Sequence, residues 1–118
     1  MVDKLTRGHI IQLFSVTQNN PDKLSRNEDT SLEYKLSFQW DEKIAKTCAA
    51  MANAHGGYIV FGINDKTRII EGLSNENYKK FEDFDIERAT NALNEIFTPN
   101  VQINKKSHMW REKNIGIL

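Results

Sequence analysis

Three carboxylates between positions 28 and 65 are of the residue type that can bind a metal ion and support phosphodiester chemistry. Glu28 and Glu33 lie five positions apart, and Asp65 directly follows an apolar segment. Carboxylate oxygens are preferred ligands of hard cations such as Mg²⁺ and Mn²⁺, and a bound cation can polarise a phosphodiester and activate water. Lys35 could hold a phosphate oxygen or stabilise developing negative charge. These four residues are candidate catalytic residues, and the three acids are candidate metal ligands.

The elements around these residues would bring them together in a sheet. Apolar and polar residues alternate over 31–37, which predicts a strand with Glu33 and Lys35 on its polar face. The segment 57–64 is apolar on both faces, as in a central strand, and Asp65 lies at its C-terminal tip. Neighbouring strands lie ~4.8 Å apart, so we expect the three carboxylates to converge.

A helix over 41–55 separates these two strands. Asp41 can cap its N-terminus, and Gly56 follows where a helix end favours a residue with positive φ. One face of the helix carries small and apolar residues, which predicts that it packs on the sheet. The predicted contact joins Ile44, Cys48 and Ala52 of the helix to Ile59, Phe61 and Ile63 of the strand.

The rest of the chain predicts further elements around the same sheet. A first helix would run from Thr6 to about Thr17, and turn residues at 64–66 would pair Ile63 with 68–70 in a hairpin. Together these elements predict an α+β fold, a mixed sheet covered by helices. The remaining predicted elements are a short helix capped by Ser74, a longer helix capped by Asp85, and late strands around 101–103 and 115–118.

The order and spacing of these pieces resemble the Alba-like domain of the Schlafen family. That domain also stands at the N-terminus of many bacterial proteins described as transcriptional regulators or divergent AAA ATPases. The resemblance covers roughly 24–73 and implies a Schlafen Alba-like fold and binding of nucleic acid. The matching pieces are Glu28 with Glu33-Tyr-Lys35, the helix end 45–54, Gly56-Gly57-Tyr-Ile-Val-Phe-Gly62 and Ile70-Glu-Gly-Leu73.

Schlafen proteins that cleave transfer RNA use two glutamates and an aspartate, and these match Glu28, Glu33 and Asp65, although Asn64 stands immediately before the aspartate. The resemblance therefore implies an Mg²⁺- or Mn²⁺-dependent endoribonuclease. The residues leave two further interpretations open, because a Glu-x-Lys on a strand is commonly a solvated ion pair and an aspartate in a turn needs no function. One is a non-catalytic DNA-binding, transcription-regulatory module, and the second is a dimerisation domain that forms a homodimer.

Zinc and ATP sites are not expected in this segment. The single Cys48 and the scattered His9, His55 and His108 lack the spacing of a zinc site. Gly56-Gly57 follows a predicted helix and precedes a strand, which is the reverse of a phosphate loop, and no G-x-x-x-x-G-K-[ST] motif is present.

Basic residues beside the predicted hairpin turn and near the C-terminus could contact RNA or DNA. A hairpin tip can follow a nucleic-acid backbone, and the Lys105-Lys106 and Trp110-Arg111 pairs combine charge with an aromatic ring, as nucleic-acid surfaces do. A charge run is also often a solvated face. The predicted nucleic-acid-binding residues are Lys35, Lys66, Arg68, Lys105 and Lys106.

Length and composition bound the remaining possibilities. The 118 residues suit one domain over 1–118, and the formal net charge of zero means that nucleic-acid affinity must come from a local patch. One cysteine excludes an intrachain disulfide and fits a reducing cytoplasm. No apolar run approaches the ~20 residues of a membrane span, so we expect no membrane partner. The apolar segment 115–118 resembles the start of a core strand, which predicts that the domain is the N-terminal part of a longer chain.

Overall fold

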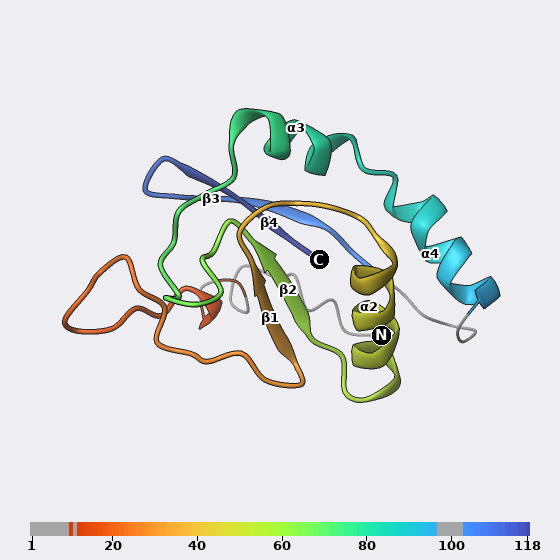
Figure 1. The fold of residues 1–118 in the computed structure, drawn as a ribbon, viewed down its shortest axis with the longest axis horizontal. Coiled ribbons are helices and arrows are strands. Elements are labelled where there is room, and N and C mark those ends of the chain that lie inside the picture. Colours follow the sequence, from red (N-terminus) through yellow and green to blue (C-terminus); the bar gives the residue numbers. More distant parts are fainter. Residues whose placement is uncertain (1–9, 11, 97–102) are drawn as a thin grey trace.

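The computed structural model describes residues 10, 12–96 and 103–118 and contains a four-stranded mixed sheet (Figure 1). Its strand order is β1-β2-β4-β3. β1 and β2 are parallel, whereas β4 pairs antiparallel with both β2 and β3. The predicted α+β class is confirmed. The strands are β1 (Leu32–Lys35), β2 (Tyr58–Phe61), β3 (Lys106–Trp110) and β4 (Lys113–Ile117).

The helices begin at the predicted capping residues. The Asp41 carboxylate accepts the Ile44 N–H at 2.9 Å, and the Ser74 and Asp85 side chains accept backbone N–H groups of their first turns at 3.2 and 3.0 Å. Each cap satisfies a donor that the helix leaves without an internal acceptor. None of the helices in the described part of the chain has the length and apolar character needed to cross a membrane. The helices are α2 (Glu42–Asn53), α3 (Asn75–Asp83) and α4 (Ile86–Ile96).

Both faces of the sheet are covered, so the domain has two core clusters. On the helix face, side chains of α2, α3 and α4 pack on β2 and on Leu118. On the opposite face, residues from the N-terminal region cover β1, β2 and β4. The helix-face cluster includes Ile44, Cys48, Met51, Ile59, Phe61, Phe81 and Leu93. The opposite cluster includes Ile10, Leu13, Phe14, Leu24, Leu32, Tyr34, Val60, Ile63, Ile70, Ile115 and Ile117.

The inner side of α2 differs from the prediction at one edge. Ile44 and Cys48 are buried with Ile59 and Phe61 as predicted, but Ala52 is exposed and Met51 is buried in its place. Ile63 belongs to the cluster on the other face of the sheet. The reason is helical periodicity, because positions 44, 48 and 51 follow one stripe and position 52 falls outside it.

Two other predicted boundaries are wrong. Residues 10, 12 and 13 are helical, but the chain then turns and Val16 pairs with Leu24 in an isolated bridge, so no helix reaches Thr17. The part of that helix before residue 10 lies outside the described residues. Of the late strand predicted at 101–103, residue 103 is described and is not in a strand, while β3 lies further along the chain and pairs with all five residues of β4. Residues 101 and 102 also lie outside the described part.

An aromatic group fills the space between the sheet and α3. The Phe38 ring meets the Phe61 and Phe81 rings edge to face, with centroids 5.0 and 5.2 Å apart. Phe81 has no exposed surface. It packs so closely on β4 that a Cβ added at Gly116 would lie 2.8 Å from its ring. This contact fixes α3 against the sheet.

Candidate nucleic-acid interface

Glu28 accepts a backbone hydrogen bond on the outer edge of β1. This strand is the last in the sheet on its side, and the Glu28 carboxylate accepts the Tyr34 N–H at 2.9 Å. Asp29 and Leu32 exchange two backbone hydrogen bonds of 3.0 and 3.3 Å beside it. The carboxylate therefore takes the place of a neighbouring strand for a donor that would otherwise have no partner in the sheet.

Glu33 and Lys35 lie on the helix face, so the prediction of an open polar face was wrong. In the parallel register Glu33 lies beside Ile59, and Lys35 beside Phe61. The two side chains are about one quarter exposed, and Lys35 Nζ lies 3.7 Å from Glu33 Oε1. Glu33 Oε2 is buried and has no hydrogen-bond partner among the described residues. Alternation in the sequence identified the strand face but could not show that α2 covers it.

The Cys48 thiol on α2 shares these surroundings. Burial, and to a smaller extent the nearby Glu33 carboxylate, raises the pKa of Cys48 to about 12. The thiol is therefore protonated near neutral pH and behaves as a small apolar group.

Asp65 lies at the exposed tip of the predicted hairpin. Ile63 and Ile70 form a bridge, and the Asn64 carbonyl accepts the Arg68 N–H at 2.7 Å. The Asn64 side-chain oxygen also accepts the Lys66 N–H at 3.0 Å. Asn64 therefore stabilises the turn through both of these hydrogen bonds. Asp65, next to it, is exposed.

The three predicted metal ligands thus occupy a strand edge, a covered sheet face and a turn tip. Within the residues that the structure describes, no group of three or more His, Cys, Asp or Glu side chains could hold a metal ion. The expected convergence is not found, because Glu28 accepts a backbone N–H at the edge of β1 while Glu33 lies against the helix-face core. As placed here, the trio does not fit a bound cation.

Lys105 is engaged by the end of α3. Its ammonium donates to the carbonyls of Phe81, Glu82 and Phe84 at 3.0, 2.6 and 2.7 Å. These carbonyls lie at the helix C-terminus, where the last turn lacks internal donors and the dipole favours a cation. Lys105 therefore has a structural role, whereas its neighbour Lys106 is exposed on β3.

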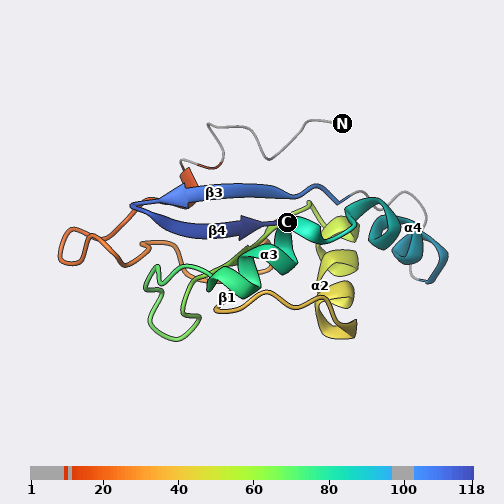
Figure 2. The same cartoon turned by 90° about the horizontal axis from the view of Figure 1, so that it is seen from above.

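Three segments distant in sequence meet at the end of the molecule opposite α4, and the first of them continues from there to the start of β1, near the end of α2 (Figures 1 and 2). The Leu24 N–H donates to the Arg68 carbonyl at 2.9 Å, which joins the first two segments. Arg111 Nη1 lies 3.8 Å from Asp22 Oδ1, which brings in the third. We call this region the loop end, and it consists of residues 22–31, 64–68 and 110–113.

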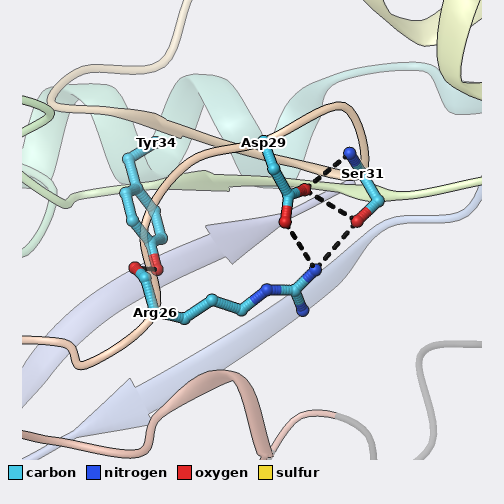
Figure 3. A network of polar contacts seen from close by, with 4 residues as sticks. All are labelled: Arg26, Asp29, Ser31 and Tyr34. Atoms are coloured by element: carbon cyan, nitrogen blue, oxygen red, sulfur yellow. Dashed lines mark hydrogen bonds and ion pairs between the residues drawn. The ribbon is translucent and has the colours of Figure 1, made fainter.

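A polar network fixes the first segment of the loop end (Figure 3). Arg26 Nη2 donates to Ser31 Oγ at 2.8 Å and lies 3.5 Å from Asp29 Oδ2. Asp29 Oδ1 accepts the Ser31 N–H at 2.7 Å, and these hydrogen bonds from Ser31 lower the pKa of Asp29. The Tyr34 hydroxyl donates to the Arg26 carbonyl at 2.7 Å, so the backbone that carries Arg26 is anchored to β1.

Arg68 ties the second segment to the first. Its Nε donates to the Leu24 carbonyl at 3.0 Å, and its Nη1 donates to the Asn27 side-chain oxygen. Lys66 stands on the exposed side of the same turn. Of the two predicted nucleic-acid contacts here, Arg68 is half-buried and shared with the fold, while Lys66 projects into solvent.

The loop end carries nearly balanced charge. Its basic residues are Lys23, Arg26, Lys66, Arg68, Arg111 and Lys113, and its acidic residues are Asp22, Glu28, Asp29, Asp65 and Glu112. Sequence reasoning missed Lys23 and Arg26, because nothing local marks them and only the pairing of Lys23 with Ile69 and of Leu24 with Arg68 brings their segment beside the 64–68 turn. With charge this balanced, affinity for a polyanion would come from particular side chains more than from a broad positive field.

Comparisons with known proteins agree with the resemblance seen in the sequence. Residues 28–118 match the family described as Schlafen, AlbA_2. The chain is similar to an uncharacterized ATP-binding protein of Ureaplasma parvum serovar 3, with 37% identity over 106 residues, covering 88% of this chain and 29% of that protein. It is similar in fold to the solved DIP2311 protein of Corynebacterium diphtheriae, with a TM-score of 0.56, 16% identity, and coverage of 93% of this chain and 21% of that one. The chain therefore spans less than a third of either protein.

Proposed function

Because the chain belongs to the Schlafen, AlbA_2 family, we propose that it binds nucleic acid through the loop end. The observation that supports this site is the junction of three sequence-distant turns that present basic side chains together. Lys66 projects from one turn, Arg26 is held by the network around Asp29, and Arg111 lies on the third. Basic side chains on rigidly held turns are suited to contact phosphates.

Charge reversal at one lysine tests this site. Affinity for fluorescein-labelled RNA and DNA oligonucleotides would be measured by anisotropy for the wild type and for Lys66→Glu. We expect Lys66→Glu to weaken binding by about fivefold or more and to reduce the slope of log K against log salt by about one.

Lys46→Glu is the matched control. Lys46 is an exposed lysine on α2, away from the loop end, and its replacement changes the net charge equally. We expect it to change affinity by less than about twofold, since a distant exposed charge is screened. Equal losses in both variants would mean that binding follows net charge alone, and a wild type that binds neither polymer would overturn the proposal.

Cleavage of RNA is a separate proposal carried by the family resemblance. One observation favours it, namely that the buried Glu33 Oε2 has no hydrogen-bond partner among the described residues, so the fold does not use this oxygen. Incubation with transfer RNA and Mn²⁺ tests it. Cleavage by the wild type that is lost in Glu33→Gln and Asp65→Asn would support endoribonuclease activity. If neither the wild type nor any variant cleaves, the endoribonuclease proposal fails and binding alone remains.

The same preparations test for a transcription-regulatory module and for a dimerisation domain. A strong preference for DNA over RNA of the same sequence would favour the regulatory module, and a dimer in light scattering would favour the dimerisation domain. We do not propose ATP binding, which the name of the Ureaplasma parvum protein includes. This chain covers 29% of that protein and has no G-x-x-x-x-G-K-[ST] motif.

A further inference from the structure

The turn between β3 and β4 has a backbone that its residues do not favour. Trp110 and Lys113 are register partners, so Arg111 and Glu112 form a two-residue connection. Their φ angles are +46° and +68°, and type I′ hairpin turns require positive φ at both central positions. Asn-Gly is the preferred pair there, because a Cβ in the left-handed conformation crowds the backbone. The chain therefore has a long side chain where a small residue would fold more easily.

The Arg111 side chain is stacked on its neighbour. Its guanidinium lies 4.7 Å from the centroid of the Trp110 ring. Trp110 is partly buried and packs against the core cluster on the face opposite the helices, so the ring beneath the guanidinium is fixed. The Arg111 side chain nevertheless remains 59% exposed. The result is a flat cationic group on a rigid aromatic support.

The other contact of Arg111 does not account for this arrangement. Asp22 lies 3.8 Å away, and its side chain is 44% exposed. An ion pair between groups this exposed contributes little to stability. Together, the disfavoured backbone and the weak ion pair indicate a role for the side chain outside folding, since local strain concentrates at functional sites.

We propose that the Arg111–Trp110 stack is a platform for an unpaired base, so that the loop end takes single-stranded nucleic acid in preference to duplex. This inference rests on the proposed nucleic-acid binding and adds the form of the ligand. Arginine planes and aromatic rings stack on bases whose faces are open, as in single strands and loops. In a duplex those faces are covered by neighbouring pairs. Lys66 and Arg26 on the adjoining segments would contact the phosphates that flank the stacked base.

Replacing Arg111 with lysine separates stacking from charge. Arg111→Lys keeps the cation but removes the planar guanidinium. Anisotropy would compare the wild type and this variant on a single strand and on the duplex of the same sequence, each as RNA and as DNA. We expect a loss of about fivefold or more on the single strands and less than about twofold on the duplexes. RNA and DNA should respond alike if the stacked face of the base is what is bound.

Glu112→Gly is the matched control from the same turn. Glycine relieves the left-handed backbone, so we expect this variant to melt higher by about 4 °C with no loss of affinity, since it removes a negative charge. A rise in melting temperature with retained binding would show that turn relaxation alone does not weaken the interface. A comparable loss of affinity in Glu112→Gly would instead assign the effect to turn conformation and overturn the stacking proposal.

Trp110 fluorescence provides a direct readout. In a Trp40→Phe background Trp110 is the sole tryptophan, and stacking of a base should quench it on titration with a single strand but not with a duplex. A wild type without affinity for any probe would refute the proposed function itself. Binding with equal affinity for single strand and duplex, unchanged in Arg111→Lys and without quenching, would refute the platform while the proposed function stood.

Discussion

On the helix face, Lys35 and Lys105 have their contacts inside the domain, whereas at the loop end Lys66 and Arg111 remain exposed. Lys105 donates to three carbonyls at the C-terminal end of α3, and Lys35 pairs with Glu33 beside the core. Arg111 instead lies over the partly buried Trp110 ring with its own side chain 59% exposed, and Lys66 is exposed on a turn. The basic residues of this domain therefore divide into two kinds. Some, such as Lys105, stabilise the fold, and others, such as Lys66, remain available to a ligand.

Truncating Phe81 should give the largest effect and act only through the fold. Phe81→Ala removes a ring with no exposed surface that packs on Phe38 and Gly116. We expect a loss of about 3–5 kcal/mol in the free energy of unfolding, measured by urea titration. Lys79→Ala, at an exposed position on the same helix, should change stability by less than about 0.5 kcal/mol. A small loss in Phe81→Ala would show that the helix face is not the main source of stability.

Replacing each member of the Lys105–Lys106 pair with methionine tests the distinction between structural and exposed lysines. Removing the Lys105 ammonium leaves the three carbonyls at the C-terminal end of α3 without that donor, so we expect a loss of about 2 kcal/mol in urea unfolding. Lys106→Met should cost less than about 0.5 kcal/mol. Anisotropy at a temperature where both variants are folded should give wild-type affinity for Lys105→Met. Weakened binding with unchanged stability would place Lys105 in the interface instead.

Alkaline pH should destabilise the helix face through Cys48. Burial raises the pKa of this thiol from 9.0 to about 12, so above pH 9 the unfolded chain loses a proton that the folded chain keeps. Stability is therefore full below pH 9 and falls by about 1.4 kcal/mol for each pH unit above it, until the folded thiol also ionises near pH 12. Between about pH 8 and pH 10, the wild type should lose about 1 kcal/mol more than Cys48→Ala. Equal losses would mean that the folded thiol ionises as in the unfolded chain.

The smallest effect is expected at Glu28, where the loop end meets the edge of β1. Glu28→Ala removes the acceptor for the Tyr34 N–H, which should cost about 1 kcal/mol in urea unfolding. Glu28→Gln retains an oxygen that can accept the same N–H and should cost less than half of that. A glutamine variant as destabilised as the alanine variant would show that the negative charge, and not the hydrogen bond, stabilises the edge.

Local signals in the sequence predicted most of the elements. Asp41, Ser74 and Asp85 cap their helices as predicted because an N-cap depends on residues three positions apart. Gly56 has the expected positive φ of 81° near the end of α2. Residue 103 is not in a strand although the alternation around it resembles one, because the position of β3 depends on its pairing with β4.

The candidate site was less predictable, because it depends on contacts across the chain. Glu33 was assigned to the correct strand, but its exposure depends on where α2 packs, which alternation does not show. The hairpin with Lys66 was predicted from turn residues. Its meeting with Arg26 and Arg111 follows only from the backbone pairing of Leu24 with Arg68 and from the position of the β3–β4 turn.

The strand order also determines how the domain can be assembled during synthesis. β2 lies between β1 and β4, yet its partners come from opposite sides of it in the sequence, with Val60 paired to Tyr34 and to Ile117. A nascent chain can therefore complete β1, α2 and β2 while one edge of β2 has no strand to pair with. Open strand edges can pair with other chains. Until the last strand folds back, that edge of the emerging chain is its most vulnerable point for misassembly, and this vulnerability disappears once β4 docks.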